Sequence, residues 1–239
     1  FKSKSEMSGN KTVDYAKSFS CENVLAQAKW YHDDLQKGGW REIQKLENKT
    51  SWIKTFPNEE IPTKVLLKFH LPLSVQQFIE ISNPKNMELR CKWDKGFVDN
   101  EVLEEYPDGG EYLIYNRVEL AWPLTDRDLV LFTTAGIEVE WYGKQAYLLP
   151  YINASHRSKP ANVGPYIRMT NGGQFIIATA DENDPDQACT IFGLSHNLYN
   201  GYLPSRHMEW LLSRAVPKNL GNFYDSLVEG HKLFFADKE

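Results

Sequence analysis

The sequence has few cysteines, no long apolar run and no excess of basic residues. Its 239 residues include three cysteines, Cys21, Cys91 and Cys189, which lie far apart and form no CxxC pair. Zinc sites and disulfide frameworks need closer or even sets, so we expect free thiols in a reducing compartment. No apolar run approaches the roughly 18 residues of a membrane span. These absences argue against a disulfide-rich secreted domain, a zinc site and a transmembrane helix.

Positive charge is also scarce. The chain has 27 Lys and Arg against 32 Asp and Glu, which gives a net charge of -5. A nucleic-acid partner would require a clustered basic excess, so none is expected. The same balance argues against strong general attraction to anionic membranes.

Motifs of common enzyme classes are missing as well. The sequence has no G-x-S-x-G, no phosphate-cradling Gly-rich loop and no H-E-x-x-H. Its six histidines are scattered. Ser195 and His196 are adjacent on a predicted strand, where they would point to opposite faces and form no nucleophile–base pair. The sequence therefore predicts no catalytic residue, no cofactor and no metal site.

Apolar residues are plentiful enough for one large core. The composition is 41% hydrophobic and 13% aromatic, with no internal repeat and no linker-like stretch. Residues 1–18 are polar and aperiodic and predict a flexible lead-in, followed by one domain over residues 19–239. Because the chain opens with Phe1, we expect that an upstream segment has been removed.

The order of predicted elements indicates an α+β domain. A helix is expected over Cys21–Gln36, a run of short strands up to His70, and a short helix over Ser74–Ile81 with Ser74 as its N-cap. Strands follow, and a long amphipathic helix opens at Pro204-Ser205 and continues past a kink at Pro217. The later strands are expected over Val98–Tyr106, Tyr112–Leu120, Asp128–Trp141, Gln145–His156, Tyr166–Asp181 and Gln187–Asn197. One curved antiparallel sheet gripping one C-terminal helix satisfies this order.

Four motifs narrow the reading to a family. They are Ala121–Val130 (AWPLTDRDLV), Arg90–Asp94 (RCKWD), Gly201–Pro204 (GYLP) and Pro217–Leu220 (PKNL). In this order they resemble the StAR-related lipid-transfer (START) domains, and the resemblance covers roughly Cys21 to Phe235. It implies a helix-grip fold with an internal cavity for one lipid, hence a carrier rather than an enzyme.

The resemblance also implies a ligand site. In members that bind phosphatidylcholine, the arginine matching Arg90 contacts the phosphate, and the glutamine near the phosphate falls on Gln174. Their aromatic cage for choline falls on four non-aromatic residues: Asn116, Leu129, Gly172 and Ser195. A choline cage works through aromatic faces, so a phospholipid with another headgroup, or a broad preference, is expected.

Other assignments stay open from the sequence. The alternative for Arg90 is a salt bridge to Asp94 or Glu119, because a buried charge needs a partner. A sterol or ceramide ligand is a further alternative, although Thr133 stands where cholesterol-type members carry an arginine. Met208, Leu211 and Leu212 are expected either to roof the cavity or to belong to a plain core.

The exit route for the ligand is expected at the last helix. We predict that this helix and the Ala121–Asp126 loop form a lid, with Trp122, Pro123 and Leu124 meeting a membrane surface and Pro217 yielding. Ordinary packing of Trp122 under the helix is the alternative. The expected protein is a monomer, cytoplasmic and peripheral at membranes. A helix-grip hydrolase or cyclase and a lipid sensor or scaffold are the competing functions.

Overall fold

The fold is built on one large antiparallel sheet. The computed structural model describes residues 14–107, 109–120, 125–161, 163–201, 214 and 216–235. Within them, an eleven-stranded sheet has the order β1-β2-β3-β12-β11-β8-β6-β5-β4, with β7 beside β8 and β9 parallel to β6. Its strands are β1 (Arg41–Leu46), β2 (Lys49–Thr55), β3 (Thr63–Leu71), β4 (Phe97–Glu105), β5 (Glu111–Val118), β6 (Arg127–Thr134), β7 (Ile137–Trp141), β8 (Lys144–Asn153), β9 (Ile167–Arg168), β11 (Gln174–Ala180) and β12 (Cys189–Ser195). A separate pair joins β10 (Thr170–Asn171) to β13 (Asn197–Leu198).

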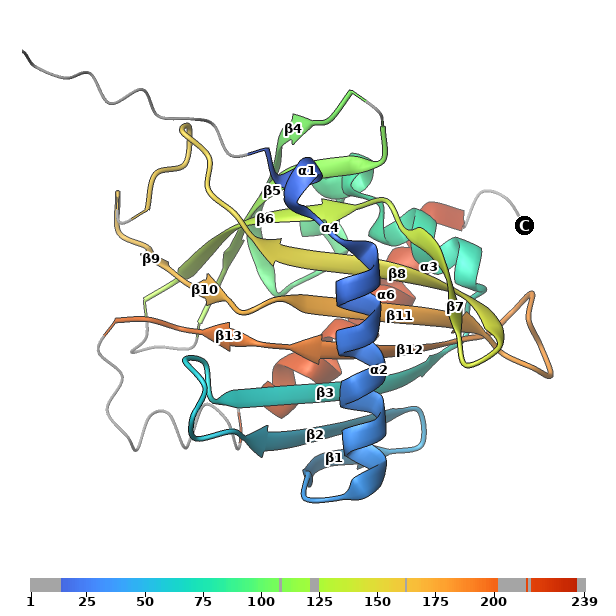
Figure 1. The fold of residues 1–239 in the computed structure, drawn as a ribbon. Coiled ribbons are helices and arrows are strands. Elements are labelled where there is room, and N and C mark those ends of the chain that lie inside the picture. The colour runs from blue at the N-terminus through green and yellow to red at the C-terminus, as the bar shows by residue number, and fades with distance from the viewer. Residues whose placement is uncertain are drawn as a thin grey trace, which may run out of the picture.

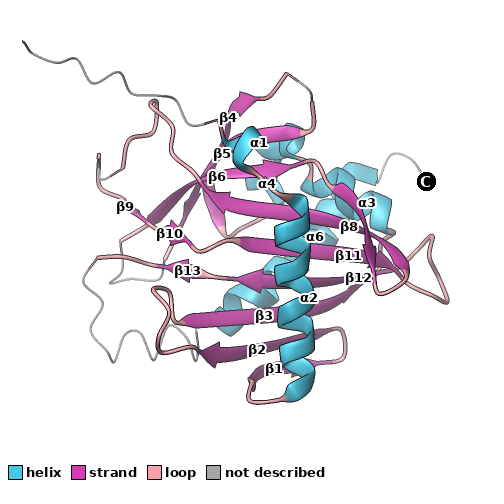
Figure 2. Cartoon of the chain, in the orientation of Figure 1, coloured by secondary structure: helices cyan, strands magenta, loops and turns pink. Residues whose placement is uncertain are grey.

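Helices cover both faces of this sheet. Figure 1 shows α2 lying across one face and α6 across the other, and Figure 2 shows the strands continuous between them. The helices are α1 (Tyr15–Ser18), α2 (Cys21–Lys37), α3 (Val75–Ser82), the 3-10 turn η1 (Pro84–Asn86), α4 (Met87–Trp93) and α6 (Val216–Phe235). This arrangement is the predicted helix-grip fold.

The two faces are distinguished by alternate residues of each strand. On β3, Leu67 and Phe69 pack with Tyr224 of α6, whereas Leu66 packs with Tyr31 of α2. We call these sides the α6 face and the α2 face. Because both are covered, β3 is apolar at consecutive positions instead of alternating between apolar and polar.

Two local predictions are confirmed at the helices. The helix predicted over Cys21–Gln36 is α2, which ends before Gly38 at a φ of +88°. Ser74 caps α3: its hydroxyl accepts the N–H of Gln77, and the Gln77 side chain accepts the N–H of Ser74. Such a reciprocal capping box satisfies two backbone donors that a helix start leaves unpaired.

Two predicted strands are wrong in extent. The segment Asp128–Trp141 is split into β6 and β7 at Gly136, whose φ is +109°. The segment Tyr166–Asp181 is split into β9, β10 and β11, with Gly173 at a φ of +90°. Glycine adopts these left-handed conformations without steric cost, so the breaks before β7 and β11 occur at glycines, whereas the break between β9 and β10 falls at Met169.

Two short helices, α1 and α4, were not predicted as helices. Tyr15–Ser18, placed in the flexible lead-in, form the helical turn α1, and the Tyr15 hydroxyl accepts the N–H of Ser155 at 2.9 Å. The RCKWD motif lies on α4 and the turn after it. Neither helix is long enough for its periodicity to stand out in the sequence.

Candidate functional site

Arg90 lies on α4, which packs against β4 at one end of the sheet. Its Nε donates to Oδ2 of Asp94 at 3.0 Å, and its guanidinium carbon lies 4.4 Å from the centre of the Phe97 ring. The Arg90 side chain is 12% exposed. The carboxylate partner foreseen as the alternative is therefore present, and it is Asp94, four residues along the same helix.

Tyr151 adds a third polar side chain to the Arg90–Asp94 pair and lies on the α6 face of the sheet. It lies on β8 within the core beneath α6, and its hydroxyl interacts with Arg90. Burial raises the pKa of the Tyr151 phenol, and the positive charge of Arg90 partly opposes that rise. Its direct neighbour across the strands is Gln174 of β11. Directly paired residues share a face, so Arg90, Tyr151 and Gln174 lie together on the α6 face.

Three of the four positions matched to a choline cage also lie on this face. Asn116 and Leu129 are direct partners on β5 and β6, and Leu129 packs in the apolar cluster beside α4. Ser195 follows Ile191 by four residues on β12 and therefore shares its orientation toward α6. At Gly172 the ring of His196 occupies the space, because a Cβ there would lie 2.4 Å from its Cε1.

A cavity lies where the start of β3 and the end of β12 meet the start of α6, and neither Arg90 nor Tyr151 lines it. Its volume is about 150 Å³, and Val65, Ser195, Asn197 and Tyr199 contribute to its wall. Val216, the first described residue of α6, also lines it. The wall is mainly apolar with a few polar groups, which is typical of a site for a largely apolar ligand.

Several buried polar atoms near the site lack a hydrogen-bond partner within the described residues. They include Oδ1 of Asn100 and of Asn116, Nε1 of Trp93 and Oδ1 of Asn197. Buried polar groups are nearly always satisfied by protein or ordered water. Asn100 and Asn116 are direct cross-strand partners, so their two unsatisfied oxygens mark one place where a ligand or water would complete the network.

Arg127 holds the chain around the site and does not enter it. Its side chain is fully buried and donates to three backbone carbonyls, those of Thr125, Tyr199 at 2.6 Å and Asn200 at 3.3 Å. These charge-assisted bonds tie the start of β6 to the segment after β13. Arg127 therefore has a structural role.

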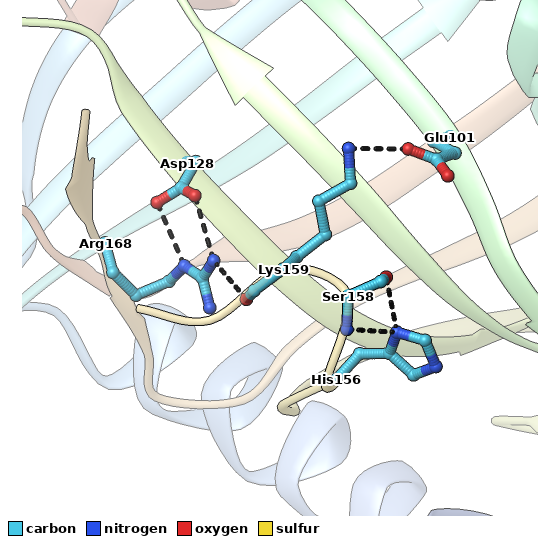
Figure 3. Close-up of polar contacts among 6 residues, drawn as sticks. All are labelled: Glu101, Asp128, His156, Ser158, Lys159 and Arg168. Carbon is cyan, nitrogen blue, oxygen red and sulfur yellow. Dashed lines mark hydrogen bonds and ion pairs between the residues drawn. The ribbon is translucent and has the colours of Figure 1, made fainter. Parts of the chain in front are cut away.

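Asp128 points to the opposite, α2 face. It accepts two bonds of 2.9 Å from Arg168, and Arg168 also donates to the carbonyl of Lys159 (Figure 3). Lys159 in turn pairs with Glu101 of β4 at 2.6 Å. These contacts anchor the loop between β8 and β9 over the sheet, so Asp128 has a structural role.

Trp93 and Asp94 are likewise structural. Trp93 is buried so closely against α6 that a Cβ at Gly230 would lie 2.9 Å from its ring. Asp94 accepts from Arg90 and from the N–H of Gly96 at 3.2 Å. Together they join α4 to α6 and to the turn before β4.

Some predicted residues lie outside the described part of the chain. These are Trp122, Pro123, Leu124, Met208, Leu211 and Leu212. Pro217 is described one residue into α6, and its carbonyl accepts from Gln44 at 3.4 Å. The kink expected there depends on residues before Val216, most of which are not described.

Membrane-spanning helices and metal clusters were also sought. Of the helices in the described ranges, none is long and apolar enough to cross a bilayer. No group of three or more His, Cys, Asp or Glu side chains in the same ranges is arranged to hold a metal ion.

Comparison with known proteins decides the family. The START domain model matches residues 23–228. The chain belongs to the START domain family. No curated protein sequence matches this START domain.

Solved structures share its fold. Human StAR-related lipid transfer protein 5 superposes with a TM-score of 0.67 at 14% identity, over 89% of this chain and 98% of that one. Human STARD10 gives 0.64 at 14% identity, over 84% and 78%. A STAR-related lipid transfer protein fragment from Xanthomonas axonopodis gives 0.63 at 14% identity, over 82% and 99%. At such identity, the likeness establishes the helix-grip fold of this START domain.

Sequence reasoning missed Tyr151 and Asn100 as site residues. Tyr151 lies on a predicted strand, but alternation alone does not say which face meets α6 when both faces are buried. Asn100 lies on a strand with two register irregularities, between Phe97 and Asp99 and between Val102 and Glu104. Such bulges change the face on which later residues fall, so its orientation follows only from the pairing.

Proposed function

We propose that this START domain carries one phospholipid beneath α6 and transfers it between membranes without altering it. The supporting observation is that Arg90, Tyr151 and Gln174 gather on the α6 face, beside apolar walls. Only the Nε–H of Arg90 donates to Asp94, so its terminal amino groups retain donors for a phosphate. Guanidinium groups bind phosphate oxygens with paired hydrogen bonds.

The headgroup preference is proposed to be broad or directed away from choline. Asn116, Leu129 and Ser195 present no aromatic ring, and His196 fills the space at Gly172. A quaternary ammonium gains its affinity from surrounding aromatic faces. Tyr112, Tyr151 and Tyr199 pack in the same cluster as Leu129, but the four matched positions themselves carry no ring, so the cage implied by the resemblance is not reproduced for choline.

A carrier is proposed because of the energy of moving lipid tails. Each buried methylene is worth about 0.8 kcal/mol against water, so a two-chain lipid rarely leaves a membrane through solvent. An apolar cavity and a bilayer are both dry, and exchange between them is nearly neutral. The rate then depends on opening the cavity at a membrane surface, for which we retain the lid formed by the last helix and the Ala121–Asp126 loop.

A neutral lipid such as a sterol or ceramide is the second candidate. Its specific support is the Arg90–Asp94 pair, since Asp94 is buried and already balances the guanidinium charge. A ligand without net charge would leave that pair intact, whereas a phosphate would compete with Asp94 for Arg90.

Native mass spectrometry followed by lipid extraction tests the proposal. A one-to-one phospholipid adduct, recovered with unchanged mass after incubation with vesicles, would support an unreactive phospholipid carrier. A sterol or ceramide would select the second candidate, and altered lipid would favour an enzyme. Protein that stays empty after exposure to mixed vesicles would contradict a carrier.

A paired substitution tests the headgroup site. Replacing Arg90 alone would leave Asp94 buried and unpaired, so the variant is Arg90→Met with Asp94→Asn. It should lose phospholipid while remaining folded, and the exposed Arg157→Ala serves as the control. Unchanged phospholipid loading in the paired variant would place the phosphate elsewhere.

We also propose a cytoplasmic location and a monomeric state. The three cysteines are free, which suits a reducing cytoplasm, and a single cavity under one helix needs only a monomer. Light scattering of the purified protein, and fractionation of cells that express it, test these two points.

A further inference from the structure

Two asparagines on neighbouring strands have side-chain oxygens that accept no hydrogen bond from the described residues. Asn100 of β4 and Asn116 of β5 are direct cross-strand partners, 9% and 3% exposed. The side-chain oxygen of each is buried, and neither has a partner within the described residues. A fold that leaves two adjacent carbonyl oxygens unpaired loses free energy unless something else donates to them.

The pair lies beside the headgroup site already described. The Asn100 side-chain nitrogen donates to Sγ of Cys91 at 3.3 Å, and Cys91 follows Arg90 on α4. Arg90 stacks on Phe97, which lies three residues before Asn100 on β4. Asn116 in turn is the direct partner of Leu129, which belongs to the apolar cluster of the α6 face.

The groups near the pair do not supply the missing donors. The Cys91 sulfur accepts a hydrogen bond from the Asn100 side-chain nitrogen, and the Asn100 side-chain oxygen stays unpaired. The cluster beside Asn116 includes three tyrosines, Tyr112, Tyr151 and Tyr199, but none of their hydroxyls is hydrogen-bonded to the Asn116 oxygen. No group among the described residues donates to either asparagine oxygen, so both acceptors are open to a bound molecule.

We propose that Asn100 and Asn116 accept hydrogen bonds from N–H or O–H groups on the lipid headgroup. This inference rests on the proposed function and adds to it a preference for lipid headgroups that carry hydrogen-bond donors. Ethanolamine offers three N–H donors, and glycerol or inositol offers hydroxyls. Choline offers none, because methyl groups replace every N–H. The two oxygens would then favour donor-bearing headgroups and leave choline with unpaired acceptors beneath it.

A methylation series on the wild-type protein tests the selection directly. Vesicles are prepared with phosphatidylethanolamine, its N-methyl and N,N-dimethyl derivatives, or phosphatidylcholine, all with the same acyl chains. The four headgroups carry equal charge and lose one donor at each step. Uptake should fall along the series, by roughly tenfold or more from the first to the last, because a charge-assisted hydrogen bond is lost with its acceptor left buried.

Further vesicles separate the two donor sources. Phosphatidylglycerol and phosphatidylinositol carry hydroxyls instead of an ammonium. Uptake of these lipids above phosphatidylcholine supports an O–H donor, and uptake of phosphatidylethanolamine alone above phosphatidylcholine supports an N–H donor. Equal uptake of all headgroups would overturn the selection while leaving the carrier proposal standing. Absence of any phospholipid uptake would overturn both.

Asparagine-to-leucine variants locate the selection. Asn116→Leu and, separately, Asn100→Leu keep the number and branching of side-chain heavy atoms, remove the whole amide including its oxygen, and should flatten the methylation series. The readout is the ratio of phosphatidylethanolamine to phosphatidylcholine uptake within each variant, which does not depend on the total uptake of that variant. The exposed Asn58→Leu is the matched control and should keep the wild-type series. A series that stays steep in both folded site variants would refute the role of these two residues.

Discussion

The tight contact between Gly172 and His196 predicts a strong coupling between the two residues. A Cβ built on Gly172 would lie 2.4, 2.5 and 2.7 Å from three atoms of the His196 ring. Ordinary carbon contacts begin near 3.5 Å, so the ring would have to retreat by about 1 Å. It is poorly free to do so, because His196 is 7% exposed and its Nε2 donates to the carbonyl of Ile61 at 3.1 Å.

The backbone allows no easy relief either. The N–H of Gly172 donates to the carbonyl of His196 at 2.8 Å, so the two segments cannot simply separate. Gly172 is not among the glycines with left-handed φ, and alanine meets no backbone strain there. The cost of Gly172→Ala is therefore steric, about 1–3 kcal/mol as for other overpacked sites.

A double-mutant cycle isolates this cost. Urea unfolding should show that Gly172→Ala lowers the free energy of unfolding by about 2 kcal/mol in the wild-type background. In the His196→Ala background the ring is gone, and the same substitution should be neutral or stabilise by up to about 1 kcal/mol. An equal loss in both backgrounds would refute a clash with the ring.

Three other predictions concern stability. Burial lowers the pKa of His196, so below about pH 6.5 the unfolded chain binds its proton first. Unfolding free energy should therefore fall on acidification, by at most about 1.4 kcal/mol per pH unit from this group, and His196→Gln should weaken the pH dependence. Asp128→Asn should lower the free energy of unfolding in urea by about 2–3 kcal/mol, because it breaks a nearly buried bidentate pair with Arg168. Replacing Asp128 and Arg168 together with apolar residues should recover most of this loss. Full stability of the single variant would contradict the prediction. Gly230→Ala should lower the thermal midpoint of unfolding and loosen α6, because the new Cβ would lie 2.9 Å from the Trp93 ring of α4. Gly221→Ala, whose nearest contact would be at 3.4 Å, should be neutral or stabilising. Equal midpoints for the two variants would contradict the packing argument.

The sequence by itself determined the elements whose signals are local. The N-cap at Ser74 and the periodicity of α2 are short-range features, and each predicted its helix. The family also followed from the sequence, because its four motifs need only be read in order. The predicted extent of a strand was wrong where one glycine, such as Gly136, interrupts an otherwise continuous apolar run.

The tertiary structure alone decided which side chains meet. Tyr151 faces Gln174, and Asn100 faces Asn116, through strand register that couples distant or irregular segments. Such register depends on the sum of long-range pairing and on bulges, and a shift of one residue would move each side chain to the other face. Because both faces of this sheet are covered, the apolar pattern does not reveal which face meets α6. Tyr151 and Asn100 could therefore be assigned to the site only from the assembled sheet, whereas Arg90 and Gln174 followed from the family resemblance.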